Sequence, residues 1–154
     1  MRINYYDLPF GAQLLLWTSR ILIKGSCRTN PDKYRLVDIA YKKVGITNGS
    51  LILRAVLLFF KRHESFRLQS ICNQILIEDE INLINCIEKN KDNKFNNNHF
   101  IKIWSITDKK NEFTLAVKKL AETYEKYNLN TNINELIYIE NIPKKTNFIN
   151  NTLH

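Results

Sequence analysis

Apolar residues recur at spacings of three and four along most of the first half of the chain, as in helices that bury one face. The first predicted helix covers residues 8–24, with Asp7 as its cap and Gly25 at its end. The second begins after an Asn-Pro pair at 30–31 and runs to Val44. Both helices are expected to pack into a shared core.

The third predicted helix starts after Thr47 or Asn48 and carries the string LILRAVLLFF. It ends in three cations at positions 61–63, where the helix dipole favours positive charge. Apart from Arg54 this helix is apolar on nearly every side, so we predict that it is the central helix of the core.

The second half of the chain contains two further strong helix patterns and several weaker elements. Residues 66–71 alternate between apolar and polar side chains, which predicts a short extended segment. A helix is predicted over 78–89, and a long one begins at Thr107 or Asp108. The string FIKIWSI fits either a strand or a helix, and ELIYIENI predicts a short strand.

Together these elements predict a mostly α fold, a compact bundle of about five helices with one or two short extended segments. A length of 154 residues fits one domain, which we place at residues 1–143 with its core at 7–129. Residues 144–154 contain too few apolar groups to offset the cost of ordering the backbone. We therefore predict that they form a disordered tail.

The net charge of +8 is unevenly distributed along the chain. Residues 1–77 hold twelve Lys and Arg against four Asp and Glu, whereas residues 78–154 hold eleven of each kind. All seven arginines lie in the first half. Such a field attracts anions, including nucleic acid and acidic lipid. The alternative is a solvated surface whose Lys content follows an AT-rich composition, since Asn and Ile are also abundant.

The cysteines and histidines do not form a recognisable site. Cys27, Cys72 and Cys86 are odd in number and widely spaced, which suits neither a disulfide framework nor a zinc site. We expect buried or incidental thiols in a reducing cytoplasm, with no metal and no cofactor. Arg20 interrupts the apolar run near the N-terminus, which is shorter than the about 20 residues of a membrane span. We therefore expect a cytoplasmic protein with no membrane contact.

The stretch DIAYKKVGITNGSL resembles the helix-turn-helix of TetR-type repressors. The match fails in its spacing, because one extra residue separates Ala40 from Gly45 and rotates the second helix by about 100°. The second helix also offers Leu, Ile, Ala and Val where a DNA-reading helix needs polar side chains. We therefore interpret Gly45 as a helix end and Asn48 as a cap.

No catalytic constellation is visible in the sequence. The carboxylate cluster Glu78-Asp79-Glu80 could hold a divalent cation, but favourable charge at a helix N-terminus explains it without a ligand. Gly45 and Gly49 do not form a phosphate loop, since no Lys-Ser or Lys-Thr pair follows them. We therefore expect that the protein is not an enzyme and has no catalytic residues.

The strings LPFGAQLLLWTSRILIKG, preceded by Asp7, and CNQILIEDEINLI resemble small helical proteins of alphaproteobacteria. The likeness covers residues 7–88. It implies a helical fold and a cytoplasmic location. It implies no mechanism, because these proteins have no assigned activity.

The leading functional hypothesis is a non-catalytic helical binding module with a basic N-terminal half. Its partner would be an acidic macromolecule, with nucleic acid contacted through its phosphates as the first candidate. The alternative is a protein–protein adaptor or homo-oligomer that uses an exposed apolar helix face. The candidate nucleic-acid contacts are the cations near helix ends and loops: Arg28, Lys33, Arg35, Lys42, Lys43, Lys61, Arg62 and Arg67.

Overall fold

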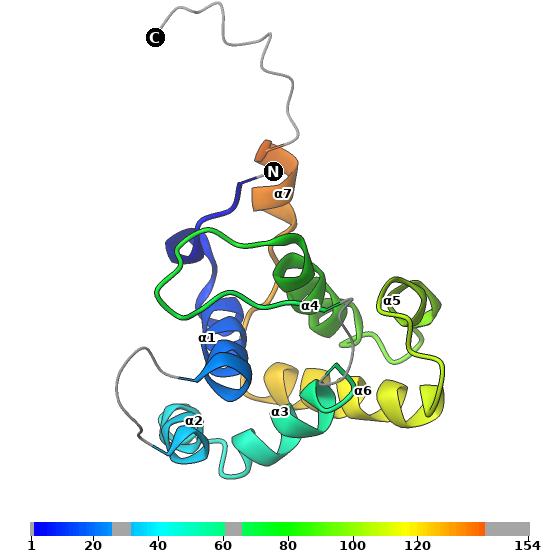
Figure 1. Ribbon diagram of the computed structural model, residues 1–154, viewed down its shortest axis with the longest axis horizontal. Helices are drawn as coiled ribbons and strands as arrows, with labels where there is room; N and C mark the ends of the chain where they lie inside the picture. The colour runs from blue at the N-terminus through cyan, green and yellow to red at the C-terminus, as the bar shows by residue number, and fades with distance from the viewer. Residues whose placement is uncertain (1, 26–31, 61–65, 141–154) are drawn as a thin grey trace, which may run out of the picture.

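The computed structural model describes residues 2–25, 32–60 and 66–140 and confirms the mostly α fold (Figure 1). These ranges hold seven α-helices where about five were expected, and one short 3-10 helix precedes them. The predicted tail, 144–154, lies outside the described residues. The elements are η1 (Tyr5–Asp7), α1 (Phe10–Lys24), α2 (Lys33–Lys42), α3 (Gly49–Leu57), α4 (Glu78–Lys89), α5 (Asn98–Ile103), α6 (Lys110–Lys126) and α7 (Asn134–Glu140).

Four helices form a closed ring around the core, since α1 packs on α3, α3 on α6, α6 on α4 and α4 on α1. Helix α2 lies against both α1 and α3, at the side of this ring (Figure 1). The interior contains an aromatic cluster in which Phe60 stacks on Phe66 with ring centroids 4.0 Å apart. Trp104 and Phe113 meet Phe60 edge-on. The core is therefore built from residues of both halves of the chain.

Helix α1 is buried on most sides, but the prediction that Asp7 caps it was wrong. The side chain of Asn4 accepts a hydrogen bond from the Tyr6 amide, and this cap produces the separate 3-10 turn η1 that ends at Asp7. The helix proper begins at Phe10, two residues after the chain leaves that turn at Leu8. Gly25 ends it with a φ of 80°, a conformation that glycine adopts without strain.

Helices α2 and α3 make a tight pair. The carboxylate of Asp32 accepts a hydrogen bond from the Tyr34 amide and starts α2, while Gly45 turns the chain with a φ of 93°. Gly49 then lies directly on the ring of Tyr41, where a Cβ atom would overlap the ring. The absence of a side chain at this position lets the two helices approach closely.

The prediction that the third helix is the central core helix was wrong on one side of that helix. Ile52, Leu53, Val56 and Leu57 are buried, but Leu51 and Leu58 are 65% and 52% exposed. Helix α3 packs on α1, α2 and α6, and these neighbours leave its outer face uncovered. The helix also ends at Leu57, and the predicted end at 61–63 lies outside the described residues.

In the second half, α4 spans the predicted 78–89, and the ambiguous string FIKIWSI belongs to the helix α5 and the turn after it. The predicted strand over ELIYIENI was wrong, because α7 covers most of it. The side chain of Asn132 accepts a hydrogen bond from the Asn134 amide and favours a helical start. Within the described ranges the only β pairing is an isolated bridge between Asn4 and Ile75.

No helix in the part of the chain that the structure describes is long and apolar enough to cross a membrane.

Candidate functional site

A cleft of about 310 Å³ opens between the end of α1, the start of α2 and the end of α3. We call it the Tyr34 cleft. Its walls are mostly apolar, and two cations and one tyrosine stand among them. The lining residues are Leu22, Ile23, Lys33, Tyr34, Arg54, Leu57, Leu58, Phe60 and Phe66.

Two positive charges lie close to the Tyr34 ring. The ammonium of Lys33 lies 5.6 Å from the ring centroid, and the guanidinium of Arg54 lies 5.2 Å from it. Both distances are within the range of cation–π attraction. Lys33 also donates a hydrogen bond of 3.0 Å to the carbonyl of Leu22, which ties the start of α2 to the end of α1. The two cations therefore meet at one aromatic side chain that is itself 39% exposed.

The charge of the cleft is unbalanced. Two of its nine lining residues are cations, and none of the lining residues in the described part of the chain carries a carboxylate. An anion that entered the cleft would therefore be attracted by the described lining residues, none of which is an acid.

Three of the predicted contact residues lie together on a different surface. Arg35 and Lys42 are exposed and seven residues apart, which is two helical turns, so they share one face of α2. Lys43 follows directly at the C-cap and is also exposed. We call these three residues the α2 cation face. Lys33 is separated from them, because its side chain enters the Tyr34 cleft.

The remaining predicted contacts do not join either group. Arg67 is exposed, but its backbone amide donates to the carboxylate of Asp79 and its neighbourhood contains Glu78. The local charge there is mixed rather than basic. Arg28, Lys61 and Arg62 lie outside the described residues.

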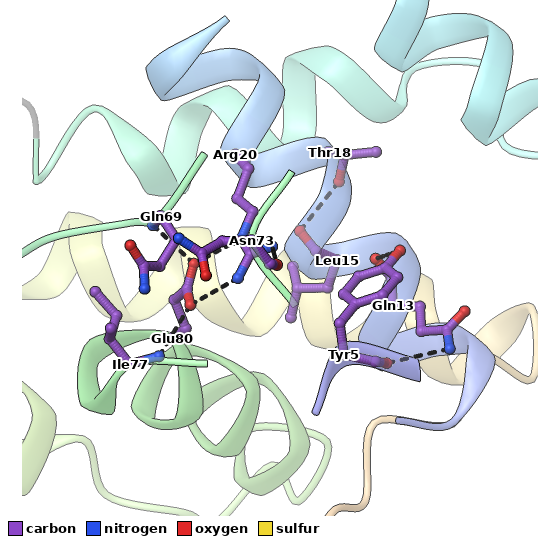
Figure 2. Close-up of polar contacts among 9 residues, drawn as sticks. All are labelled: Tyr5, Gln13, Leu15, Thr18, Arg20, Gln69, Asn73, Ile77 and Glu80. Atoms are coloured by element: carbon purple, nitrogen blue, oxygen red, sulfur yellow. Dashed lines mark hydrogen bonds and ion pairs between the residues drawn. The ribbon is translucent and has the colours of Figure 1, made fainter. Parts of the chain in front are cut away.

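Arg20 is buried in the core and forms an ion pair with Glu80, and neither role was predicted from the sequence. Nε and one terminal nitrogen of Arg20 donate to the two carboxylate oxygens of Glu80, at 2.7 Å and 2.9 Å. The other terminal nitrogen donates to the carbonyl of Asn73 at 2.7 Å. Figure 2 shows the guanidinium reaching from α1 to α4 across the segment that carries Gln69 and Asn73.

The same contacts argue against a metal site at the acidic start of α4. Glu80 accepts hydrogen bonds from the backbone amides of Gln69 and Ile77 in addition to the arginine (Figure 2). Asp79 accepts from the Arg67 amide and from the indole of Trp104. Within the ranges described here, no group of three potential metal ligands comes together. The location of the three acids in the first turn of a helix is confirmed, and Asp79 and Glu80 make structural contacts there.

A second buried polar group links α1, α2 and α6 through hydroxyls. The hydroxyls of Tyr41 and Tyr124 lie 2.7 Å apart, and the Thr18 hydroxyl lies 3.2 Å from that of Tyr41. Burial raises the pKa of Tyr41 to about 12 and raises the pKa of Tyr124 well above its usual value. These phenols are therefore neutral hydrogen-bonding groups near neutral pH.

The prediction of buried or incidental thiols is confirmed for Cys86 and was wrong for Cys72. Cys72 is exposed and disulfide-bonded, whereas Cys86 is buried and free. Burial raises the pKa of the Cys86 thiol, so it is not a reactive thiolate. Cys27 lies outside the described residues.

The sequence does not reveal the cleft, because the spacing of Tyr34 relative to Val37 and Tyr41 fits a buried stripe, whereas Tyr34 is 39% exposed. The sequence did contain one signal. Arg54 is the only charge in the apolar string of the third helix, and it is one of the two cations beside Tyr34.

No protein-family model, curated protein or solved structure matches this chain.

Proposed function

We propose that this chain is a non-catalytic binding module for an acidic macromolecule, with nucleic acid as the leading partner. The observation that supports this function is the α2 cation face, where Arg35, Lys42 and Lys43 are all exposed.

The expected mode of binding is contact with phosphates. Long cations that remain in water attract the backbone of any sequence, so the binding should show little preference among sequences. Each cation that neutralises a phosphate releases counterions, so the affinity should fall steeply as salt rises.

Fluorescence anisotropy with labelled single-stranded and duplex oligonucleotides, at two salt concentrations, tests this proposal. The triple variant Arg35→Gln/Lys42→Gln/Lys43→Gln should lose binding, and its salt slope should fall by about one per cation removed. The matched control removes three exposed cations from α5 and α6: Lys102→Gln, Lys110→Gln and Lys119→Gln. An absence of binding at low salt, or an equal loss in the control, would contradict the proposal.

A protein partner is the second candidate, and the outer face of α3 favours it. Leu51 and Leu58 are exposed and seven residues apart, so they form a stripe on one side of the helix, with the exposed residues Arg54 and Ala55 between them. Such a stripe is the kind of surface that a partner helix or a second copy covers.

Light scattering after size exclusion tests this second candidate. The variant Leu51→Ser/Leu58→Ser should shift an associated species to the monomer. Leu115→Ser on α6 should leave it unchanged, although Leu115 is 68% exposed. A monomer at every concentration would count against self-association.

A further inference from the structure

The Tyr34 cleft is separate from the α2 cation face, on which the leading proposed function rests. The α2 cation face lies on the outside of its helix, whereas the cleft has volume and apolar walls. A phosphate backbone needs neither of these properties. The cleft therefore fits a ligand of another chemical class.

The inner part of the cleft is apolar. Leu57, Phe60 and Phe66 are 2%, 3% and 8% exposed, and the two phenylalanines are continuous with the aromatic cluster of the core. Ile23 and Leu58 form a more exposed rim, at 38% and 52%. A hydrocarbon chain in this space would cover apolar surface of Ile23 and Leu58 that is otherwise open to water.

The polar part of the cleft is cationic and converges on one point. Lys33 and Arg54 lie on opposite helices and both approach the Tyr34 ring. The ammonium of Lys33 has three donors, and the Leu22 carbonyl accepts only one of them. A carboxylate placed between the two cations would add the negative charge that the described lining residues do not supply.

We propose that the Tyr34 cleft binds a monomeric amphiphile that has one apolar chain and a carboxylate headgroup. The chain lies against Leu57 and Phe66, and the headgroup lies between Lys33 and Arg54. The volume of about 310 Å³ is near the lower end of small-molecule pockets, so it suits one chain rather than the two chains of a bilayer lipid.

Calorimetric titration of the full chain with decanoate, decanol and acetate distinguishes the contribution of the apolar chain from that of the carboxylate. Decanoate should bind, and acetate should not. Decanol should bind about twentyfold more weakly, because it lacks the charge that the two cations contact. Amide chemical shifts should move at residues 22–23, 33–34 and 54–58 when decanoate is added.

Variants then test the cations one at a time. Lys33→Gln and Arg54→Gln should each weaken decanoate binding about fivefold, the size of one half-exposed charge contact. Lys110→Gln and Leu115→Ser are matched surface controls on α6 and should bind normally. Thermal melts confirm that each variant is folded.

Three results would overturn the inference. Decanol could bind as tightly as decanoate, or the α6 controls could weaken binding as much as the cleft variants. The protein could instead bind only vesicles that contain anionic lipid and ignore monomeric decanoate. Each of these results is independent of the oligonucleotide titration, so the failure of one proposal leaves the other standing.

Discussion

At the residue scale, the strongest constraint on the fold is the buried charge of Arg20. The guanidinium is 1% exposed and would be costly to bury alone. It donates hydrogen bonds to both carboxylate oxygens of Glu80 and to one backbone carbonyl. The two residues are 60 positions apart, so the pairing joins α1 to α4 across the core. Removing one partner should be far worse than neutralising both.

We expect Arg20→Met to lower the free energy of unfolding by about 3–5 kcal/mol, because it leaves the Glu80 carboxylate buried without a counter-ion. Arg20→Met/Glu80→Gln should recover part of this loss, since a neutral amide can still accept from the Gln69 or Ile77 amide. Urea unfolding of both variants measures the difference. Equal losses would show that packing, and not the unpaired charge, is responsible.

The hydroxyl pair of Tyr41 and Tyr124 predicts a loss of stability at alkaline pH. The pKa of Tyr41 rises from 10.0 to about 12 on folding, so the unfolded chain releases this proton first as the pH increases. Above pH 10 the unfolded state binds fewer protons than the native state, and the free energy of unfolding therefore falls, by up to about 1.4 kcal/mol per pH unit for each tyrosine.

Unfolding midpoints measured between pH 8 and pH 12 (a range chosen about the ordinary tyrosine pKa of about 10) test this expectation. Tyr41→Phe/Tyr124→Phe removes the two buried phenols and should give a flatter alkaline limb than the wild type. An unchanged slope in this variant would mean that other groups cause the alkaline loss.

The sequence pattern predicted the helix α4, but it did not predict that Arg20 pairs with Glu80, the third residue of this helix. Glu80 has the same sequence signature as Glu78, an acid in the first turn of a helix, yet one is buried and the other exposed. The difference depends on a guanidinium that arrives from a distant helix. Local periodicity contains no information about such a pair.

At the element scale, α3 has two faces that its composition does not distinguish. Leu57→Asp places a charge at a position that is 2% exposed, so it should destabilise the fold by more than about 4 kcal/mol. Leu51→Asp makes the same change at a position that is 65% exposed and should cost about 0.5 kcal/mol or less. Thermal and urea melts of the pair measure the asymmetry. Similar losses would mean that the outer face of α3 is covered.

The secondary-structure predictions were correct where the local signals agreed and wrong where they favoured different structures. Helix α4 combines acids at its start with an isoleucine stripe, and both bounds were correct. The string ELIYIENI has β-branched residues that favour a strand, but Asn132 caps a helix there and no strand in the described ranges offers a partner. The outer face of α3 could not be predicted, because a uniformly apolar helix does not reveal which side its neighbours cover.

At the scale of the whole molecule, the two ends of the helical core meet at Gly11. The carbonyl of Asn130 accepts a hydrogen bond of 3.0 Å from the Ala12 amide. A Cβ atom on Gly11 would overlap the backbone of Leu129 and Asn130. This contact holds the segment between α6 and α7 against the start of α1.

We therefore expect Gly11→Ala to destabilise the protein by about 1–3 kcal/mol. The sign of the change in unfolding free energy distinguishes the two cases, since Gly→Ala at an uncrowded helical position would stabilise the protein by up to about 1 kcal/mol. Hydrogen exchange at the Ala12 amide should accelerate together with the loss of unfolding free energy. A stabilised variant with a protected Ala12 amide would show that the segment moves aside easily.

The buried pair of Arg20 and Glu80 also affects the order in which the chain can fold as it is synthesised. Helix α1 leaves the ribosome with its guanidinium before any residue of α4 exists, so the helix cannot be buried without cost until residue 80 has emerged. The Tyr41 hydroxyl can pair with that of Tyr124 only after a further 83 residues have been synthesised. The N-terminal half of the chain is basic, but it therefore cannot fold by itself. A fragment that ends before α4 should remain a substrate for chaperones and proteases.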